Sequence, residues 1–311
     1  MNDKPKIWVT EPIHPDAMAA LRAQADVIGP GPATPEERAQ ISAIIVRTLQ
    51  VDAALLATLP RLAVVGKHGA GTDNIDSKAL EAAGIELHSA AGQNADSVAD
   101  LAVGLALMLL RQPDLHDRSL RDASPAPGVS RIGFELSEVS IGILGLGAIG
   151  RKVAHRLHFG FGARVSAYDP ALPAQSWPAD VQRHESLSAL LSASRLLFVH
   201  LPLLPATRGL IGAAELAQMP KGSFIVNCAR GGILREEALA DALREGQLAG
   251  AASDVFETEP PSPQNPLFDG LRFIGTPHIG ASTHAALHRT GLHIVGKVLT
   301  ALTHSKTKQG N

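Results

Sequence analysis

The 311-residue sequence contains a single cysteine, Cys228, and aromatic residues make up only 4% of it. One cysteine excludes a framework of intrachain disulfides and fits a reducing compartment, so we expect a cytoplasmic protein. The first residues, MNDKPKIWVTEP, lack the apolar stretch of a signal peptide. No apolar run reaches the roughly 20 residues that a bilayer span needs, so no membrane association is expected.

Charge is also scarce, because charged residues make up 19% of the chain and the formal net charge is −2. This balance gives no electrostatic reason to expect nucleic acid or an anionic membrane as a partner. Hydrophobic residues make up 45% of the sequence, which is enough to bury a large core. A chain of this length is more typical of two domains than of one.

Short apolar runs alternate with helix-like stretches along the chain. Runs that are apolar on both faces suit buried parallel strands, and their alternation with helices predicts an α/β fold with parallel sheets. Residues 97–112 are apolar nearly all round and predict a helix, buried either in a domain core or in a dimer interface. The runs form two series: KIWVT, AIIVR and LAVVG, and then SIGILG, RVSAYD, LLFVHLP, SFIVNCA and LAGAASDVF.

The stretch SIGILGLGAIGRKVAHRL carries the pattern G-x-G-x-x-G at Gly145, Gly147 and Gly150. In this pattern the first glycine permits a tight turn, the second lets the backbone approach a pyrophosphate, and the third lets helix and strand pack closely. The N–H groups and dipole of the following helix then meet the phosphate charge. Because the pattern follows an apolar strand and opens a helix, it indicates a dinucleotide site.

The next apolar run, RVSAYD, ends at Asp169. An acid about 20 residues after the last glycine binds the ribose 2′-hydroxyl and repels a 2′-phosphate. We therefore expect NAD as the cofactor, in preference to NADP. The alternative interpretation of Asp169 is a turn residue before Pro170.

An arginine, acids and a histidine follow three further apolar runs in turn: Arg230, then Asp254 and Glu259, then His278. In open α/β sheets, ligands bind at the carboxyl ends of the strands. The planar fork of an arginine suits a carboxylate, and a histidine can supply a proton near neutral pH. A hydrogen-bonded carboxylate can orient that histidine and favour its charged form. The set suits the reduction of a 2-oxo acid.

With these motifs, the sequence resembles the D-isomer-specific 2-hydroxyacid dehydrogenases, the family that includes D-3-phosphoglycerate dehydrogenase and hydroxypyruvate/glyoxylate reductase. The resemblance runs from about residue 40 to 290 in family order. It implies an NAD-dependent oxidoreductase acting on a CH–OH group, and a homodimer. The matching segments are GKHGAGTDNID (66–76), NADSVAD (94–100), GILGLGAIG, HLPLLPATRGLI (200–211), NCARGGIL, DVFETEP and TPHIGAST.

The resemblance also implies a fold of two doubly wound parallel-sheet domains. A Rossmann NAD-binding domain, expected over 98–281, is inserted into a flavodoxin-like substrate domain. That second domain is expected to be discontinuous, over 1–97 and 282–311, and completed by a helix near 282–303. Long phosphoglycerate dehydrogenases carry a further regulatory domain for which 311 residues leave no room, so feedback control by serine is not expected.

Roles for individual residues follow from the same resemblance. Arg230 is expected to bind the substrate carboxylate and polarise its carbonyl, and His278 to act as acid and base, assisted by Glu259. Substrate contacts are expected from Arg230 and His278 together with Arg47, Lys67, Gly69, Ala70 and Gly71. The expected cofactor contacts are Ser97, Gly145, Gly147, Ala148, Ile149, Gly150, Asp169, His200, Pro202, Thr207, Cys228, Ala229 and Asp254.

Some of these assignments have alternatives. Cys228 also suits a small buried strand residue, and Ala148 stands where the family often has an arginine. Arg47 and Lys67 either hold an anionic or polar C3 substituent, as in hydroxypyruvate or phosphohydroxypyruvate, or are charges on the rim of a cleft. We find no metal-spaced cluster of His and Cys along the sequence and expect no metal.

Two other functions fit the resemblance. A formate or phosphite dehydrogenase is one, although formate enzymes pair their histidine with glutamine where this chain has Glu259. The other is an NADH-sensing corepressor of transcription, which keeps the same arginine, glutamate and histidine. The physiological acid, among hydroxypyruvate, glycerate and 3-phosphoglycerate types, stays open.

Overall fold

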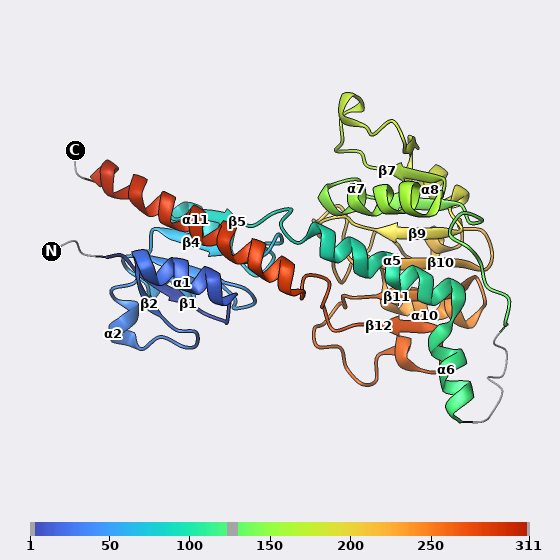
Figure 1. The fold of residues 1–311 in the computed structure, drawn as a ribbon, viewed down its shortest axis with the longest axis horizontal. Helices are drawn as coiled ribbons and strands as arrows, with labels where there is room; N and C mark the ends of the chain where they lie inside the picture. Colours follow the sequence, from blue (N-terminus) through green and yellow to red (C-terminus); the bar gives the residue numbers. More distant parts are fainter. Residues whose placement is uncertain (1–3, 123–129, 310–311) are drawn as a thin grey trace. The chain divides into compact units, whose positions relative to one another are not determined.

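The computed structural model describes residues 4–122 and 130–309, and its contacts divide the chain into two compact units (Figure 1). Unit 1 comprises Met1–Asn94 and Ala281–Asn311, and unit 2 comprises Ala95–Gly280. The sequence prediction placed these divisions at 98 and 282. In the part of the chain that the structure describes, no helix combines the length and apolarity needed to cross a membrane.

Unit 1 contains a five-stranded parallel sheet in the order β2-β1-β3-β4-β5, the order of flavodoxin-like folds. Its strands are β1 (Lys6–Val9), β2 (Asp26–Ile28), β3 (Ala43–Val46), β4 (Val64–Lys67) and β5 (Glu86–Ser89). Its helices are α1 (Pro15–Gln24), α2 (Pro35–Arg38), α3 (Ala53–Ala57), α4 (Ser77–Ala82) and α11 (His284–Gln309).

Alternating residues of the strands in unit 1 serve two cores, one on each face of the sheet. Ile7 and Val9 pack under α1 and α11, whereas Trp8 packs on the opposite face with residues of α3 and α4. Helix α11 lies very close to the sheet, because a Cβ on Gly66 of β4 would lie 2.5 Å from the Val298 side chain. The helix near 282–303 that the sequence predicted is α11.

Unit 2 contains a seven-stranded parallel sheet in the order β12-β11-β10-β9-β6-β7-β8, which is the Rossmann order with one strand added. Its strands are β6 (Ile141–Leu144), β7 (Val165–Tyr168), β8 (Gln182–Arg183), β9 (Leu196–Val199), β10 (Ser223–Asn227), β11 (Leu248–Ser253) and β12 (Phe273–Gly275). Its helical segments are α5 (Ala95–Arg111), α6 (Pro113–Arg121), α7 (Ala148–His155), η1 (Arg156–Gly160), η2 (Ala174–Ser176), α8 (Leu187–Ala193), α9 (Ala213–Leu216), α10 (Glu236–Arg244) and η3 (Pro266–Phe268).

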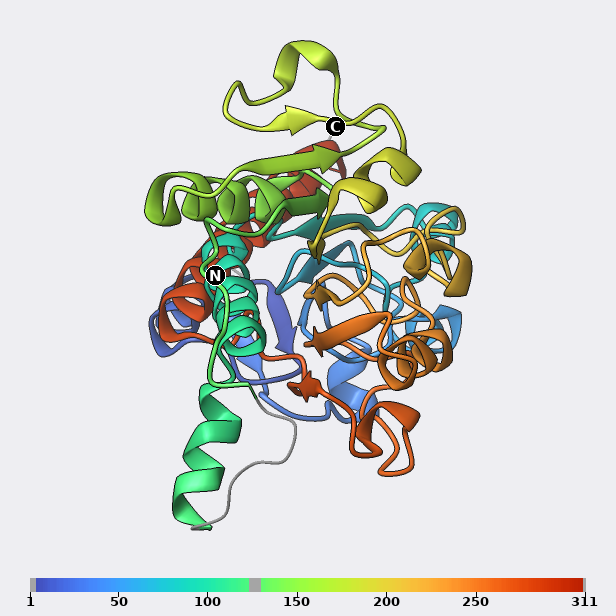
Figure 2. The same cartoon turned by 90° about the vertical axis from the view of Figure 1, so that its right-hand side faces the viewer.

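The sheet of unit 2 is also covered on both faces. Phe198 and Val226 face a core that includes α5 and α7, and Leu197 and Ile225 face a core that includes α8 and α10. Ten residues of α5 are buried, so this helix, predicted over 97–112, is part of the domain core. In both views α6 leaves the end of α5 and extends beyond the sheet (Figures 1 and 2). The predicted fold class is confirmed.

All eight apolar runs that predicted strands form strands. Four further strands lie outside these eight runs, namely β2, β5, β8 and β12, and these are the four outer strands of the two sheets. Of the four, only the strand before His278, β12, was expected. Their burial patterns contain no buried residue. A strand at the edge of a sheet need not be apolar, so it leaves a weak signal in the sequence.

Candidate active site

The glycine pattern of unit 2 forms the turn between β6 and α7, at the point where the strand order reverses between β6 and β9. Gly145 has φ of 94°, and a Cβ on it would lie 2.8 Å from the carbonyl oxygen of His200. A Cβ on Gly150 would lie 2.1 Å from the Gly145 oxygen. By contrast, a Cβ on Gly147 would meet nothing within 4 Å, so this position borders open space.

These features fit a dinucleotide. Ligands of doubly wound sheets bind at the reversal of strand order, and the pyrophosphate lies at the N-terminus of the first helix. Gly147 is the N-cap of α7 and has no side chain to cap its N–H groups, which leaves them available to phosphate oxygens. Ala148 and Ile149 form the first turn of α7, so their backbone lies at the same edge.

Asp169 follows β7 and lies against this turn. Its Oδ2 accepts a hydrogen bond from Leu146 N at 2.8 Å, and its Oδ1 accepts one from Ala171 N at 3.0 Å. The carboxylate therefore both shapes the turn after β7 and stands beside the glycine-rich loop. The two interpretations of Asp169 from the sequence, ribose ligand and turn residue, are compatible in this geometry.

The residues after β9 line the other side of the same reversal point. Both ring nitrogens of His200 are buried and have no hydrogen-bond partner among the described residues. Burial lowers the pKa of His200 to about 3, so the ring is neutral at physiological pH. The Thr207 hydroxyl donates to Pro202 O at 2.6 Å and accepts from Leu204 N at 2.8 Å, which fixes the loop after β9.

Three further predicted cofactor contacts are small buried residues. Ser97 lies in the first turns of α5, and Cys228 and Ala229 follow β10. Burial, with the nearby Asp254 carboxylate, raises the pKa of the Cys228 thiol. Cys228 is therefore a neutral thiol rather than a nucleophile. It is small and buried, as the alternative interpretation expected, but it lies just after β10 and not within the strand.

His278 and Glu259 are paired in unit 2. His278 Nδ1 lies 2.7 Å from Glu259 Oε2, while Glu259 Oε1 accepts a hydrogen bond from Phe256 N at 3.1 Å. The hydrogen bond to Glu259 raises the pKa of His278 above its usual value, against the effect of burial. Burial alone would raise the pKa of Glu259, but the hydrogen bonds from His278 and Phe256 lower it. The pair thus favours a charged imidazolium beside a carboxylate.

Asp254 holds the loop that carries His278. One oxygen of its carboxylate accepts from the Thr276 hydroxyl at 2.6 Å and from Ile279 N at 2.8 Å, and the other accepts from Gly280 N at 2.8 Å. His278 N also donates to the Asp254 carbonyl at 2.9 Å. These bonds hold His278 at a φ of 53°, a conformation that non-glycine residues seldom adopt.

Arg230 completes the set. It follows β10, which lies beside β11, and β11 lies beside β12, so Arg230, Asp254 and His278 come from the carboxyl ends of three neighbouring strands. The Arg230 charge lowers the pKa of both Glu259 and His278. A Cβ on the next residue, Gly231, would lie 1.7 Å from the Phe256 carbonyl oxygen, so the chain there requires glycine.

The predicted substrate residues of unit 1 lie at the ends of β3 and β4. Lys67 is buried, and its ammonium donates to the Arg47 carbonyl and to Asn74 Oδ1, so it holds this loop together. The guanidinium of Arg47 donates to Pro12 O at 3.3 Å. Gly69 has φ of 157° and is followed by the partly buried Ala70 and Gly71.

Two residues that were given no role from the sequence, Glu11 and His68, lie at the same edge of unit 1, and Glu11 organises it. The Glu11 carboxylate accepts from the backbone N–H groups of Arg47, Thr48 and Leu49 at 2.7–2.9 Å. Burial would raise the pKa of Glu11, but these bonds and the Thr10 hydroxyl lower it to about 2. His68 is 6% exposed, and burial together with the Arg47 charge lowers its pKa to about 4. In the sequence, Glu11 is marked only by its place after an apolar run, and His68 only by its place in a glycine-rich loop.

Comparison with known proteins accounts for this geometry. Residues 103–280 match the family model described as D-isomer specific 2-hydroxyacid dehydrogenase, NAD binding domain. The chain belongs to this family. Its second unit is accordingly an NAD-binding domain, which confirms the cofactor and the family expected from the sequence.

Among relatives, D-3-phosphoglycerate dehydrogenase of Methanocaldococcus jannaschii is 36% identical over 303 residues, which cover 96% of this chain and 57% of the relative. The enzyme of the same name from Mycobacterium tuberculosis is 39% identical over 308 residues, with the same coverage. This chain therefore spans little more than half the length of these relatives. The crystal structure of a glyoxylate reductase from Paecilomyes thermophila superposes with a TM-score of 0.85 at 28% identity, covering 97% of this chain and 96% of the other.

Adding a methyl group at Gly147 tests whether the glycine-rich turn before α7 binds the dinucleotide. We expect Gly147→Ala to fold normally, because the new Cβ meets no protein atom, but to weaken NADH binding by about tenfold by filling the space a pyrophosphate needs. Fluorescence titration with NADH measures the dissociation constant. Gly104→Ala is the matched control, because a Cβ there also meets nothing within 4 Å. An unchanged dissociation constant in Gly147→Ala would contradict the assignment.

Proposed function

We propose that this protein is an NAD-dependent D-2-hydroxyacid dehydrogenase that interconverts a small 2-oxo acid and its 2-hydroxy acid in the cytoplasm. The observation that carries the proposal is the His278–Glu259 pair, 2.7 Å between Nδ1 and Oε2, which stands beside Arg230 in the NAD-binding unit. An imidazolium held by a carboxylate is a proton donor, and an arginine next to it is a carboxylate ligand.

The hydrogen bond between His278 and Glu259 determines which nitrogen of His278 can exchange a proton with the substrate. Because His278 Nδ1 is bonded to Glu259, Nε2 is the nitrogen left to give a proton to the substrate carbonyl oxygen. The Arg230 guanidinium binds the substrate carboxylate and polarises the carbonyl. NAD(H), when bound, supplies the hydride to the carbonyl carbon of the oxo acid, or accepts it from the same carbon of the hydroxy acid. In the oxidative direction, neutral His278 takes the hydroxyl proton, and Glu259 stabilises the imidazolium that forms.

The cofactor would be held by the turn at Gly145, Gly147 and Gly150, with Asp169 toward the ribose. The Asp169 carboxylate already lies against the turn through Leu146 N, so a 2′-phosphate there would meet negative charge. His200, Thr207 and the residues after β10 would enclose the remainder. This arrangement supports NAD over NADP.

For the substrate, the residues of unit 1 support an acid with a polar or anionic group at C3, of the hydroxypyruvate/glycerate or 3-phosphoglycerate type. Arg47 is the better candidate for that contact, because the Lys67 ammonium already holds the loop through Arg47 O and Asn74. The relatives named above are D-3-phosphoglycerate dehydrogenases, which favours the same class.

A panel of 2-oxo acids tests the proposal directly. We expect NADH oxidation, followed by absorbance, with one or more of hydroxypyruvate, phosphohydroxypyruvate, glyoxylate and pyruvate. His278→Ala should reduce turnover by about 10²–10⁴-fold while NADH binding stays nearly unchanged, since only the proton donor is lost. Arg230→Lys should also be severely impaired, because a point charge cannot replace a bidentate fork.

Two outcomes would reject the proposal. Full turnover in His278→Ala would show that this histidine is not the acid. Tight NADH binding without turnover of any acid, phosphite or formate would favour a sensor of the corepressor type instead.

The pH dependence tests the pair. Reduction requires protonated His278, whose pKa is raised by Glu259, so kcat/KM for reduction should fall as pH rises through a value above 6.5. Glu259→Gln keeps the size of the side chain but removes its charge, so the fall should move to lower pH. Glu257→Gln, two residues away, is the matched control. Profiles that coincide in wild type and Glu259→Gln would contradict the pairing.

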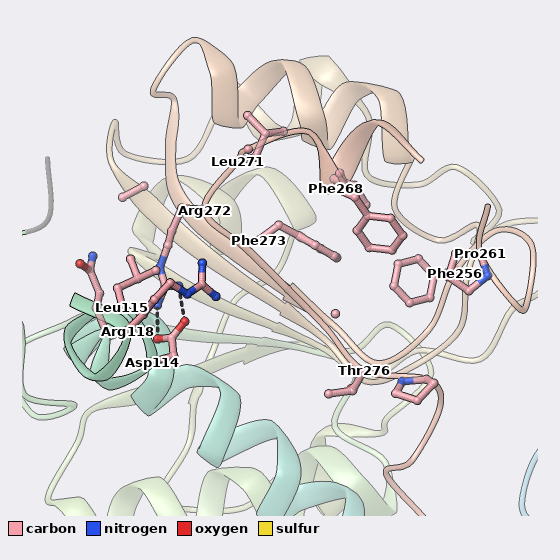
Figure 3. Close-up of a pocket in the computed structure, with 16 residues that line it drawn as sticks. Asp114, Leu115, Arg118, Phe256, Pro261, Phe268, Leu271, Arg272, Phe273 and Thr276 are labelled. Carbon is pink, nitrogen blue, oxygen red and sulfur yellow. Dashed lines mark hydrogen bonds and ion pairs between the residues drawn. The ribbon is translucent and has the colours of Figure 1, made fainter. Parts of the chain in front are cut away.

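We propose further that the protein is a homodimer in which α6 takes part. A cavity of about 800 Å³ lies between α6 and the β12 edge of unit 2, with Phe256, Phe268 and Phe273 in its wall (Figure 3). Arg272 and Asp114 form an ion pair at 2.9 Å at its other end. Leu120 of α6 and Ile132 are 81% and 86% exposed, more than any other large exposed hydrophobic side chain of the described residues, which supports an interface.

Sedimentation velocity tests the dimer. We expect wild type to sediment as a dimer, and Leu120→Glu combined with Ile132→Glu to sediment as a monomer, because burying two carboxylates in an apolar interface is costly. Phe159→Glu, which alters a 65% exposed apolar side chain elsewhere in unit 2, should remain dimeric. A wild-type monomer at micromolar concentration would overturn the proposal.

A further inference from the structure

Three side chains of unit 1 that are far apart in the sequence meet where α1 lies beside α11 (Figure 1). His14 is the N-cap of α1, and Asp16 lies in the first turn of that helix. His288 lies near the start of α11. None of the three belongs to the dinucleotide turn or to the His278–Glu259 pair.

Their ligand atoms already face one another. Asp16 Oδ2 lies 3.7 Å from His14 Nδ1 and 3.3 Å from His288 Nε2. One nitrogen or oxygen from each residue lies within 4.8 Å of the others, and the two imidazole rings meet edge to face at 4.7 Å between centroids. Around a tetrahedral zinc with bonds of about 2.0–2.2 Å, neighbouring ligand atoms are about 3.3–3.6 Å apart.

The backbone explains why the two helices can approach so closely. Gly291, three residues after His288, lies against α1, where a Cβ on it would be 2.7 Å from the Ala17 Cβ. The same Cβ position is 3.7 Å from the His14 Cβ and 3.6 Å from Nε2 of His68. His68 is 6% exposed, and that nitrogen has no hydrogen-bond partner among the described residues. A further nitrogen donor thus lies on the inner side of the same helix crossing.

We propose that His14, Asp16 and His288 form a binding site for a divalent transition-metal ion of the zinc class. Two imidazoles and one carboxylate are ligands that such ions prefer, and three protein ligands leave a position for water. His14 Nδ1 now accepts a hydrogen bond from Asp16 N at 3.2 Å, so its lone pair is directed toward Asp16. The metal takes the place of that long hydrogen bond.

The site ties the segment before α1 to α11. That segment carries Glu11, which holds the backbone of Arg47 to Leu49, and α11 covers the sheet that ends at the Lys67 loop. Because the ligands come together only when unit 1 is folded, the ion binds the folded state and stabilises it. Metal binding is therefore expected to raise the unfolding temperature of unit 1 specifically.

The test uses the full chain without an affinity tag, after removal of metals with a chelator. We expect titration with Co²⁺ to give the visible absorption of a low-symmetry, four- or five-coordinate site at one equivalent, and Zn²⁺ to displace it. His288→Ala and Asp16→Asn should each weaken Zn²⁺ binding by at least about tenfold, because even the loss of a residue that only supports a ligand costs that much. Zn²⁺ should raise the unfolding temperature of wild type but not of His288→Ala.

Two further variants separate this site from general binding by surface histidines. His293→Ala removes a histidine of the same helix that is not part of the cluster, and it should bind as wild type does. His14→Ser keeps an oxygen to cap α1 but removes the imidazole, so it should fold and lose the site. The proposal is overturned if wild type binds no Co²⁺ or Zn²⁺. It is also overturned if His288→Ala binds like wild type, or if His293→Ala loses as much affinity as His288→Ala.

Discussion

The geometry of the candidate active site in unit 2 depends on the Asp254 carboxylate. It is buried at the end of β11 and accepts hydrogen bonds from the Thr276 hydroxyl and from the N–H groups of Ile279 and Gly280. A charged acceptor with three donors is strong enough to hold a loop in an unfavourable conformation, here His278 at a φ of 53°. In that conformation the imidazole contacts Glu259, so the proposed acid, its partner and their pKa shifts depend on the loop that Asp254 holds.

The inner strands of both sheets could be predicted because they are buried on two faces. AIIVR and LLFVHLP, for example, contain the fully buried strands β3 and β9. Outer strands leave a weaker signal for the converse reason: β8, Gln182–Arg183, is polar and exposed, and β5 carries Glu86 and His88. Tertiary position rather than intrinsic preference makes these segments strands, and a single sequence carries no record of that position.

The candidate site could be predicted where its residues stand in short sequence motifs. The glycine turn, Arg230 and His278 each stand in a short motif whose residue types have a physical reason. Glu11 has no such motif, because its partners at Arg47 to Leu49 are brought to it by the pairing of β1 with β3. The cluster of His14, Asp16 and His288 is hidden in the same way. A search for metal ligands at short spacing does not connect α1 with α11.

The packing of α11 on the first sheet has a consequence for biosynthesis. Ile294, Val295 and Val298 form part of the same core as Ile7 and Val9, whereas unit 2 contains all of its own strands between residues 95 and 280. As the chain emerges from the ribosome, the NAD-binding unit can complete its core first. Until α11 has been synthesised, one apolar face of the sheet in unit 1 stays incompletely covered. Helix α11 thus acts as the closing step of folding, and the nascent chain is most exposed to aggregation and to chaperones just before that helix is released.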